Sequence, residues 1–302
     1  MAANLPELST PTRAFISGLA DEAGHLEAEP LFIAADAAGF STTKLRLAIK
    51  RMIDGGLLTS TGRGRKAKLQ LTEAGLAART PDLIWAAAAY RADAGLDPWD
   101  GIWHLAAFEI PENQRTARDA LRNQIRDLYG APLTSGLYLS PLPWEPWLHT
   151  VAAAHDVSDR LTTIETTVLH HGGITDPEGL AAAVWPVADI HADYEAFISR
   201  WEPILAAIPP TPATAVRAAF EANADFEAVF RRDPLLPADL VPDTFAGPAA
   251  RVLFMGLTDA FGQHEILAEA SLFGAYRSAI AAALDANQQD FWARALRATK
   301  NR

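Results

Sequence analysis

Basic residues gather in one short stretch of the sequence, between positions 41 and 68. This stretch contains eight lysines and arginines and a single acid, Asp54, so it has a net charge of +7. The rest of the chain carries 18 basic and 36 acidic residues, a net charge of −18. A cluster of cations in an otherwise acidic chain is the electrostatic footprint of a surface that binds DNA. The alternative is a basic helix face that is merely solvated.

Two elements in this stretch are expected to make different contacts with DNA. The first turns of a helix over 42–54 reach base edges, while Lys50 and Arg51 lie further along and hold phosphate. A glycine-rich turn projects Arg63 and Arg65 toward an adjacent minor groove or the phosphate backbone. The predicted DNA-binding residues are Ser41, Thr42, Thr43, Lys44, Arg46, Lys50, Arg51, Arg63, Arg65, Lys66 and Lys68.

The elements that position these residues follow the order of a winged helix-turn-helix. Ser41 is a good N-cap for the helix that begins at Thr42, and Gly55-Gly56 ends it. Two short strand-like runs then surround the basic turn. We predict helices over 12–20, 31–38 and 42–54 and strands over 57–60 and 66–71.

The remainder of the chain predicts two further domains. The pattern between residues 97 and 173 is β-α-β-α-β, with one further short strand left open, which suits a ferredoxin-like α+β domain. Apolar residues at helical spacing continue from there to the end of the chain. We therefore predict an α+β multidomain protein with a winged helix-turn-helix domain (1–83), a helical connector (84–96), a ferredoxin-like domain (97–173) and an all-α domain (174–302).

Length and composition exclude several classes of protein. The chain has 302 residues, which suits two or three domains at roughly 100–200 residues each. It has no cysteine, which excludes disulfide scaffolds, cysteine zinc sites and thiol nucleophiles. No apolar run approaches a membrane span, and the N-terminus lacks the pattern of a signal peptide. We expect a cytoplasmic protein with no membrane partner.

Motifs for catalysis are absent from the sequence. There is no glycine-rich phosphate loop and no Gly-x-Ser-x-Gly elbow. His170 and His171 would point to opposite faces of a strand, so they cannot easily chelate one metal. We predict no catalytic residue, no metal site and no cofactor. The alternative is a metal-dependent nuclease, but Asp100 and Glu109 are too few for the converging carboxylates that it needs.

Tryptophans and a pair of arginines are the candidates for binding a small molecule. Arg231-Arg232, beside a proline-stiffened loop, can bind a phosphorylated or carboxylated ligand bidentately. Equally, these arginines can pair with acids such as Asp233. Tryptophans at predicted domain junctions can line an apolar pocket, although such residues are more often core. These tryptophans are Trp99, Trp103, Trp185 and Trp201.

Three groups of motifs resemble the PaaX family of bacterial transcriptional repressors. The first is a basic Gly-Arg-Gly-Arg turn closed by Leu71-Thr72-x-x-Gly75. The second combines Trp99-Asp100-Gly101-x-Trp103 with Gly136-Leu137-Tyr138-Leu139-Ser140-Pro141. The third combines Arg232-Asp233-Pro234-Leu235-Leu236-Pro237 with Ala250-Arg251. Together they cover nearly the whole chain in the family's order.

The resemblance implies an architecture and a function. It implies a winged-helix N-terminal domain, a Cas2-like ferredoxin-fold middle and a helical C-terminal domain. It also implies a homodimer that represses catabolic genes, which we expect to act at a pseudo-palindromic double-stranded DNA operator. Release would follow binding of a small-molecule effector, an acyl-CoA thioester such as phenylacetyl-CoA, and Arg251 joins the candidate effector residues. The chain departs from the family at Ala67 and Leu69, where aromatic residues are expected. An architectural DNA binder without an effector is the other alternative.

Overall fold

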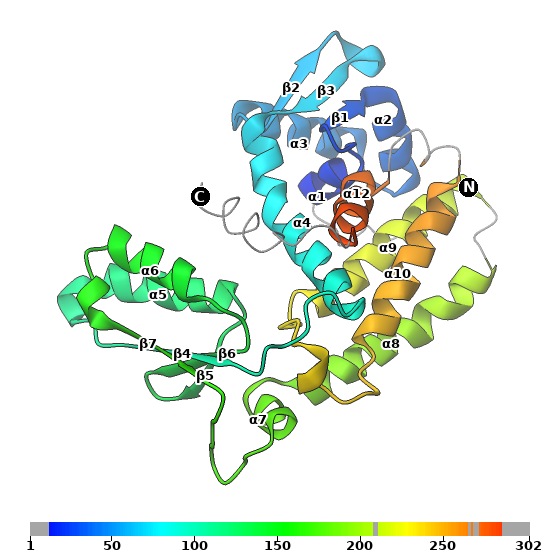
Figure 1. Cartoon of the computed structure of the whole chain (residues 1–302). Helices are drawn as coiled ribbons and strands as arrows, with labels where there is room; N and C mark the ends of the chain where they lie inside the picture. The colour runs from blue at the N-terminus through cyan, green and yellow to red at the C-terminus, as the bar shows by residue number, and fades with distance from the viewer. Residues whose placement is uncertain (1–11, 208–210, 265–266, 268–271, 286–302) are drawn as a thin grey trace. The chain divides into compact units, whose positions relative to one another are not determined.

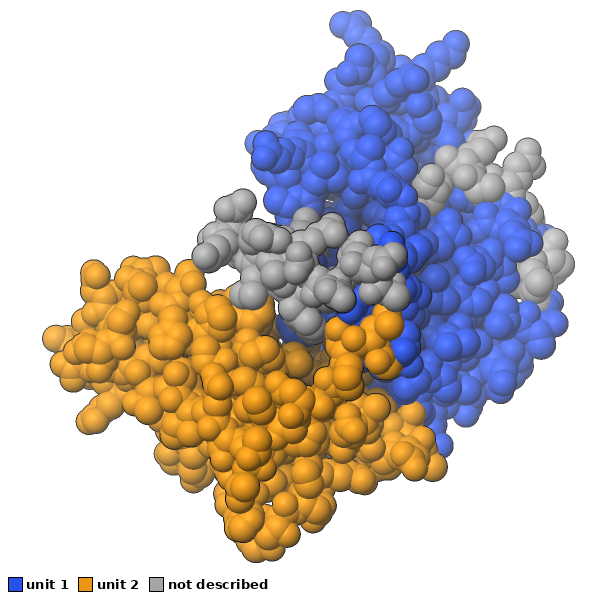
Figure 2. Space-filling model, viewed as in Figure 1, with its two compact units in different colours: residues 1–94, 193–231, 246–302 blue, residues 95–192, 232–245 orange. Residues whose placement is uncertain are grey.

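The computed structural model describes residues 12–207, 211–264, 267 and 272–285 of the chain (Figure 1). The chain forms two compact units, each assembled from separate segments (Figure 2). Unit 1 comprises residues 1–94, 193–231 and 246–302, and unit 2 comprises residues 95–192 and 232–245. In the described part of the chain, no helix has the length and apolar character needed to cross a membrane.

Unit 1 opens with three helices and a three-stranded antiparallel sheet. The sheet has the order β1–β3–β2, and Thr61 pairs with Lys68 where the β2–β3 hairpin turns. The helices and the hairpin lie where the sequence predicts them, whereas β1 is too short to show an alternating pattern and was missed. The elements are α1 (Thr12–Gly18), β1 (His25–Glu27), α2 (Ala28–Ala37), α3 (Thr42–Asp54), β2 (Leu58–Thr61), the 3₁₀ turn η1 (Gly64–Lys66) and β3 (Lys68–Leu71).

A long helix, α4 (Glu73–Asp93), follows directly on β3. Thr72 caps its start: the hydroxyl accepts a hydrogen bond from the Gly75 amide at 3.1 Å and donates one to the Gly56 carbonyl at 2.6 Å. The helical connector expected from residue 84 is therefore the second half of a helix that starts at Glu73. The division into three domains at the predicted boundaries stays a prediction.

Helices from the C-terminal half of the chain complete unit 1. Phe15 of α1 lies 4.3 Å, ring centroid to ring centroid, from Phe220, which in turn lies 5.6 Å from Phe273. Segments separated by some two hundred positions in the sequence thus share one core. The helices are α8 (Val187–Ala207, of which the residues from 193 onward belong to unit 1), α9 (Pro212–Phe230), α10 (Gly247–Gly262) and α12 (Gly274–Ala283).

Unit 2 is built on a four-stranded antiparallel sheet of order β5–β6–β4–β7. With its two helices the sequence of elements is βαββαβ, the ferredoxin-like arrangement. β5 is the further strand that the sequence left open, an edge strand that contains Pro132. The elements are β4 (Trp103–Phe108), η2 (Glu112–Gln114), α5 (Arg115–Asp127), β5 (Ala131–Thr134), β6 (Leu137–Ser140), α6 (Glu145–Ala154), η3 (Ser158–Arg160), β7 (Leu161–Thr166), α7 (Pro177–Val184) and η4 (Ala238–Leu240).

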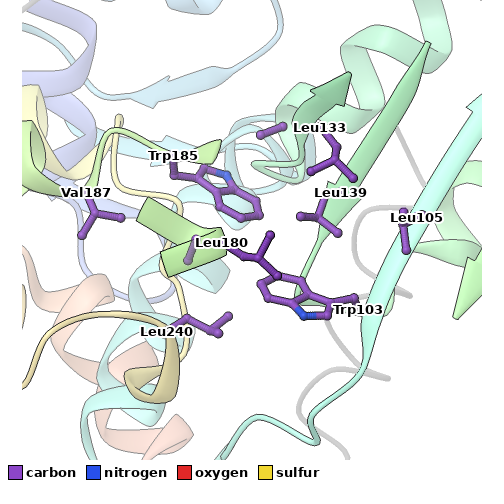
Figure 3. Packing of buried hydrophobic residues seen from close by; sticks show 10 residues of the cluster. Trp103, Leu105, Leu133, Leu139, Leu180, Trp185, Val187 and Leu240 are labelled. Carbon is purple, nitrogen blue, oxygen red and sulfur yellow. The ribbon is translucent and has the colours of Figure 1, made fainter. Parts of the chain in front are cut away.

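Each face of this sheet is buried in its own hydrophobic cluster. On one face, Ala106 of β4 packs with Leu121 of α5 and Leu148 of α6. On the other face, α7 and η4 supply the cover, so α7 packs with the central sheet although the sequence assigns it to the C-terminal domain. That second cluster includes Trp103, Leu105, Leu133, Leu139, Leu180, Trp185, Val187 and Leu240 (Figure 3).

Gly75 is required by a close approach between α4 and the hairpin. A β-carbon at this position would overlap the carbonyl oxygen of Leu57, a backbone atom that cannot move away cheaply. We expect Gly75→Ala to lower the free energy of unfolding by about 1–3 kcal/mol, measured as a shift of the urea midpoint. Gly262→Ala is the control, because its nearest atom is 3.6 Å away at the tip of Arg277. Equal effects of the two substitutions would contradict this explanation.

Candidate nucleic-acid interface

Helix α3 presents one apolar and one basic face. Leu45 and Met52, seven residues apart, are buried at 0% and 4% exposure and fix the orientation of the helix. Its start is fixed by Ser41, whose hydroxyl accepts a hydrogen bond from the Lys44 amide at 3.2 Å. The predicted DNA-binding residues of this segment are all exposed: Ser41, Thr42, Thr43, Lys44, Arg46, Lys50 and Arg51.

The β2–β3 hairpin carries its basic residues on a turn that two glycines make possible. Gly62 and Gly64 have φ angles of +89° and +66°, which residues with a β-carbon rarely adopt. Ala67 and Leu69 point inward and are buried, and the Ala67 carbonyl accepts a hydrogen bond from the Ala28 amide at 3.0 Å. The hairpin is thereby fixed to α2. Arg63, Arg65, Lys66 and Lys68 are exposed.

A hollow of about 600 Å³ lies between α2, α3 and the hairpin. Its apolar lining includes Phe32 and Ile33 from α2, which sequence reasoning missed, and Ile53 from α3. Ile33 and Ile53 are 40% and 38% exposed, so apolar contact area adjoins the basic residues. Four predicted DNA-binding arginines and lysines meet around this hollow: Arg46, Lys50, Arg63 and Arg65.

Most of the basic charge at this surface is not neutralised by the protein. Lys50 pairs with Asp54 at 2.5 Å and Lys68 with Glu27 at 3.4 Å, but both pairs are exposed, where ion pairs are weak. The Arg46 guanidinium lies 5.9 Å from the centre of the Phe32 ring, a cation–π contact that leaves its charge in place. Across the described residues, no carboxylate is within ion-pair distance of Arg51, Arg63, Arg65 or Lys66.

Three of the four candidate effector tryptophans meet in unit 2. The Trp103 ring lies 5.0 Å from Trp99 and 6.4 Å from Trp185, centroid to centroid, and Figure 3 shows Trp103 and Trp185 within the cluster. The indole N–H groups of Trp99 and Trp185 donate to the carbonyls of Ile102 and Tyr129 at 3.1 and 3.0 Å. Packing and internal hydrogen bonds thus account for these side chains, and a pocket-lining role stays a prediction.

Trp201, the fourth candidate, lies in unit 1. It is 1% exposed, and its indole N–H donates to the Asp225 carboxylate at 2.9 Å. Arg231 is exposed and lies 3.4 Å from the Glu227 carboxylate. Arg232 is exposed as well, while Asp233 is buried and accepts a hydrogen bond from the Leu235 amide at 2.8 Å. An anion-binding role for the two arginines stays a prediction.

Arg251, the last effector candidate, is engaged in a buried ion pair. Its Nε and Nη2 each donate a 2.6 Å hydrogen bond to the Asp93 carboxylate. The Tyr90 hydroxyl donates to the Arg251 carbonyl at 2.9 Å, and burial raises the pKa of Tyr90 well above its ordinary value. Arg251 thus joins α10 to α4 within unit 1 and has a structural partner for its guanidinium.

The carboxylates considered for a nuclease do not converge. Asp100 precedes β4, where its side chain accepts a hydrogen bond from the Ile102 amide at 2.9 Å, and Glu109 follows the same strand. A six-residue strand is roughly 20 Å long, so these two groups cannot ligate one ion.

Comparison with known proteins decides the family. Residues 96–181 match the family model described as the PaaX protein central Cas2-like domain, and residues 185–266 match that of the PaaX-like protein C-terminal domain. The chain belongs to the PaaX family. The resemblance indicated by the sequence motifs is confirmed. The Cas2-like central domain of the family lies in unit 2. Neither model includes α3 or the β2–β3 hairpin.

Two individual proteins extend this comparison. The transcriptional repressor PaaX of Escherichia coli (strain K12) is 28% identical over 243 residues, covering 72% of this chain and 69% of the repressor. The family is therefore one of transcriptional regulators and not of enzymes, as the sequence predicts. The solved structure of the uncharacterized protein Rv0674 from Mycobacterium tuberculosis has a TM-score of 0.55 at 20% identity over 83% of this chain and 92% of that chain, which supports the fold alone.

The ion pair between Arg251 and Asp93 gives a test of the structural role of Arg251. Asp93→Ala leaves a buried guanidinium without its counter-charge, so we expect a loss of about 3–5 kcal/mol in the free energy of unfolding. Glu227→Ala removes the exposed pair with Arg231 and serves as the control, with an expected loss below about 0.5 kcal/mol. Chemical denaturation of both variants checks this. If Asp93→Ala is as mild as the control, Arg251 is not held by Asp93.

Proposed function

We propose that this chain is a DNA-binding transcriptional repressor whose N-terminal elements form a winged helix-turn-helix. In this proposal α3 is the recognition helix and the β2–β3 hairpin is the wing. The supporting observation is the basic rim of the hollow, where Arg46 and Lys50 on α3 face Arg63 and Arg65 on the turn. Among the described residues, no carboxylate lies within ion-pair distance of Arg63 or Arg65, so a phosphate backbone can neutralise their charge.

The two basic elements are proposed to perform different parts of recognition. The N-terminal turns of α3, with Thr42, Thr43 and Arg46, enter the major groove, where arginine donates two hydrogen bonds to guanine and threonine contacts a thymine methyl. Lys50 and Arg51 lie further along the helix and bind phosphate. Arg63 and Arg65 bind the backbone or the adjacent minor groove and fix the register of the helix.

We further propose that the repressor acts as a homodimer released by a small-molecule effector. Two winged domains related by a two-fold axis would match a pseudo-palindromic operator with half-sites about one helical turn, or a multiple, apart. Membership of the PaaX family supports repression, and an acyl-CoA thioester is the effector that the resemblance implies. An effector that binds the DNA-free arrangement more tightly lowers operator affinity by the same coupling free energy.

The paired replacement Arg63→Ala and Arg65→Ala tests the wing. Each phosphate contact contributes about 0.9 to the slope of log affinity against log salt concentration, so we expect the slope to fall by about 2 and binding to weaken at every sequence tested. The measurement is fluorescence anisotropy on the chain's own promoter DNA across a salt series. Arg115→Ala with Arg160→Ala is a charge-matched control from unit 2, where both residues are exposed. Unchanged affinity and slope in the wing variant would place DNA elsewhere.

A thioester effector is tested by its effect on the folded state and on DNA. At about 100 times its dissociation constant, a ligand stabilises a protein by about 2.7 kcal/mol, a rise in melting temperature on the order of 5 °C at this chain length. We expect phenylacetyl-CoA or a related acyl-CoA to produce this rise and to release the operator, whereas free coenzyme A does not. If no acyl-CoA in a panel changes the melting temperature or releases the operator, the architectural DNA binder is favoured. That result would not affect the conclusion from the wing variant, which tests DNA binding alone.

A further inference from the structure

Three potential metal ligands from separate elements meet on the helix-covered face of the unit 2 sheet. His104 on β4 and Glu165 on β7 are direct cross-strand partners. Partners in an antiparallel pair extend to the same side of the sheet, so both side chains share a face with Ala106, which packs beneath α5 and α6. The first turn of α6 brings Glu145 to the same place.

The geometry of this group is tight. One ligand atom from each of His104, Glu145 and Glu165 lies within 4.8 Å of the other two. The His104 Nδ1 is 2.8 Å from the Glu145 carboxylate, and these two side chains are 4% and 15% exposed. Glu165 is exposed, so solvent reaches the group from one side. An ion can therefore enter without any opening of the core.

The hydrogen-bonding and ion-pairing capacity of this group is only partly used within the described part of the chain. His104 Nε2 is buried and has no hydrogen-bond partner in the described part of the chain. Neither Glu145 nor Glu165 is within ion-pair distance of a described lysine or arginine. The imidazole and the two carboxylates meet without a basic side chain within ion-pair distance, and a cation would neutralise the charge of this group.

We propose that His104, Glu145 and Glu165 form a binding site for a divalent transition-metal ion, with Zn²⁺ as the best match. Zn²⁺ combines imidazole nitrogen with carboxylate oxygen, whereas Mg²⁺ and Ca²⁺ prefer sites made of oxygen alone. Three protein ligands leave a fourth position for water on the exposed side. The ion links β4, β7 and α6, so it stabilises the Cas2-like domain by mass action.

No pattern in the sequence indicates this site, because the prediction of no metal considered only the spacing of ligands along the chain. The ligands are separated by 41 and 20 positions, so they form no motif. They meet because the β4–β7 register pairs His104 with Glu165. The site lies within unit 2, so it does not rest on the proposed DNA binding.

Zn²⁺ titration of the full chain, freed of metal beforehand, tests the site. We expect saturable binding of one equivalent in competition with a chromophoric chelator, and a weakening of roughly tenfold or more in Glu165→Gln. Glu165 is exposed, so this substitution spares the core. Glu109→Gln, at the opposite end of β4, and His149→Asn, an exposed histidine on α6, are the matched controls and are expected to bind like the wild type.

Two further readouts fix the ligands and the class of ion. Substitution with Co²⁺ is expected to give a visible absorption band that is lost in His104→Asn, and Zn²⁺ is expected to raise the melting temperature of the wild type but not of Glu165→Gln. Absence of saturable binding, or Glu165→Gln binding like the wild type, would overturn the proposal and leave His104 and Glu145 as a hydrogen-bonded pair only. Tighter binding of Mg²⁺ than of Zn²⁺ would overturn the choice of ion.

Discussion

A chain of aromatic contacts through unit 1 is the constraint on which the basic surface depends. Phe40, next to the start of α3, lies 4.8 Å from Phe15, and Phe15 lies 4.3 Å from Phe220 of α9. From there the contacts continue through Phe273 to Phe254 of α10, at 5.6 and 6.2 Å. Buried aromatic pairs contribute beyond their burial of area. The elements that carry the cations are thus held by helices from the far half of the chain, and their core is shared.

Helix α4 connects the region of α3 and the β2–β3 hairpin to the C-terminal helices of unit 1. At its N-terminal end, Thr72 joins the helix to Gly56 at the end of α3, and at its C-terminal end Asp93 holds Arg251 of α10. Between them, Arg91 donates a 2.7 Å hydrogen bond to the Ala283 carbonyl of α12. A buried charge pair with two short hydrogen bonds permits little relative sliding of the helices. These contacts join α10 and α12 to the helix that follows the hairpin, within unit 1.

Local chemistry made much of the candidate interface predictable from the sequence. Ser41 and the Gly55-Gly56 pair placed α3 at Thr42–Asp54, because capping and chain reversal depend on adjacent residues. The hairpin followed from Gly62 and Gly64 for the same reason. What the sequence did not reveal depends on contacts between distant segments: the three-residue strand β1, the hollow completed by Phe32 and Ile33, and the group around His104. In each case the residues that come together are far apart in the sequence and meet through tertiary packing. Periodicity and spacing along the chain do not reveal such contacts.

The distribution of charge explains how a chain of net charge −11 can present a surface for a polyanion. At physiological ionic strength the Debye length is about 8 Å, so DNA near the surface senses only the charges closest to it. Near α3 and the hairpin these include Arg46, Arg63 and Arg65, whereas acids outnumber bases two to one over the rest of the chain. A duplex that approaches elsewhere meets net repulsion, and one that approaches this surface meets attraction. If DNA binds as proposed, the excess of acidic residues elsewhere disfavours non-specific binding away from α3 and the β2–β3 hairpin.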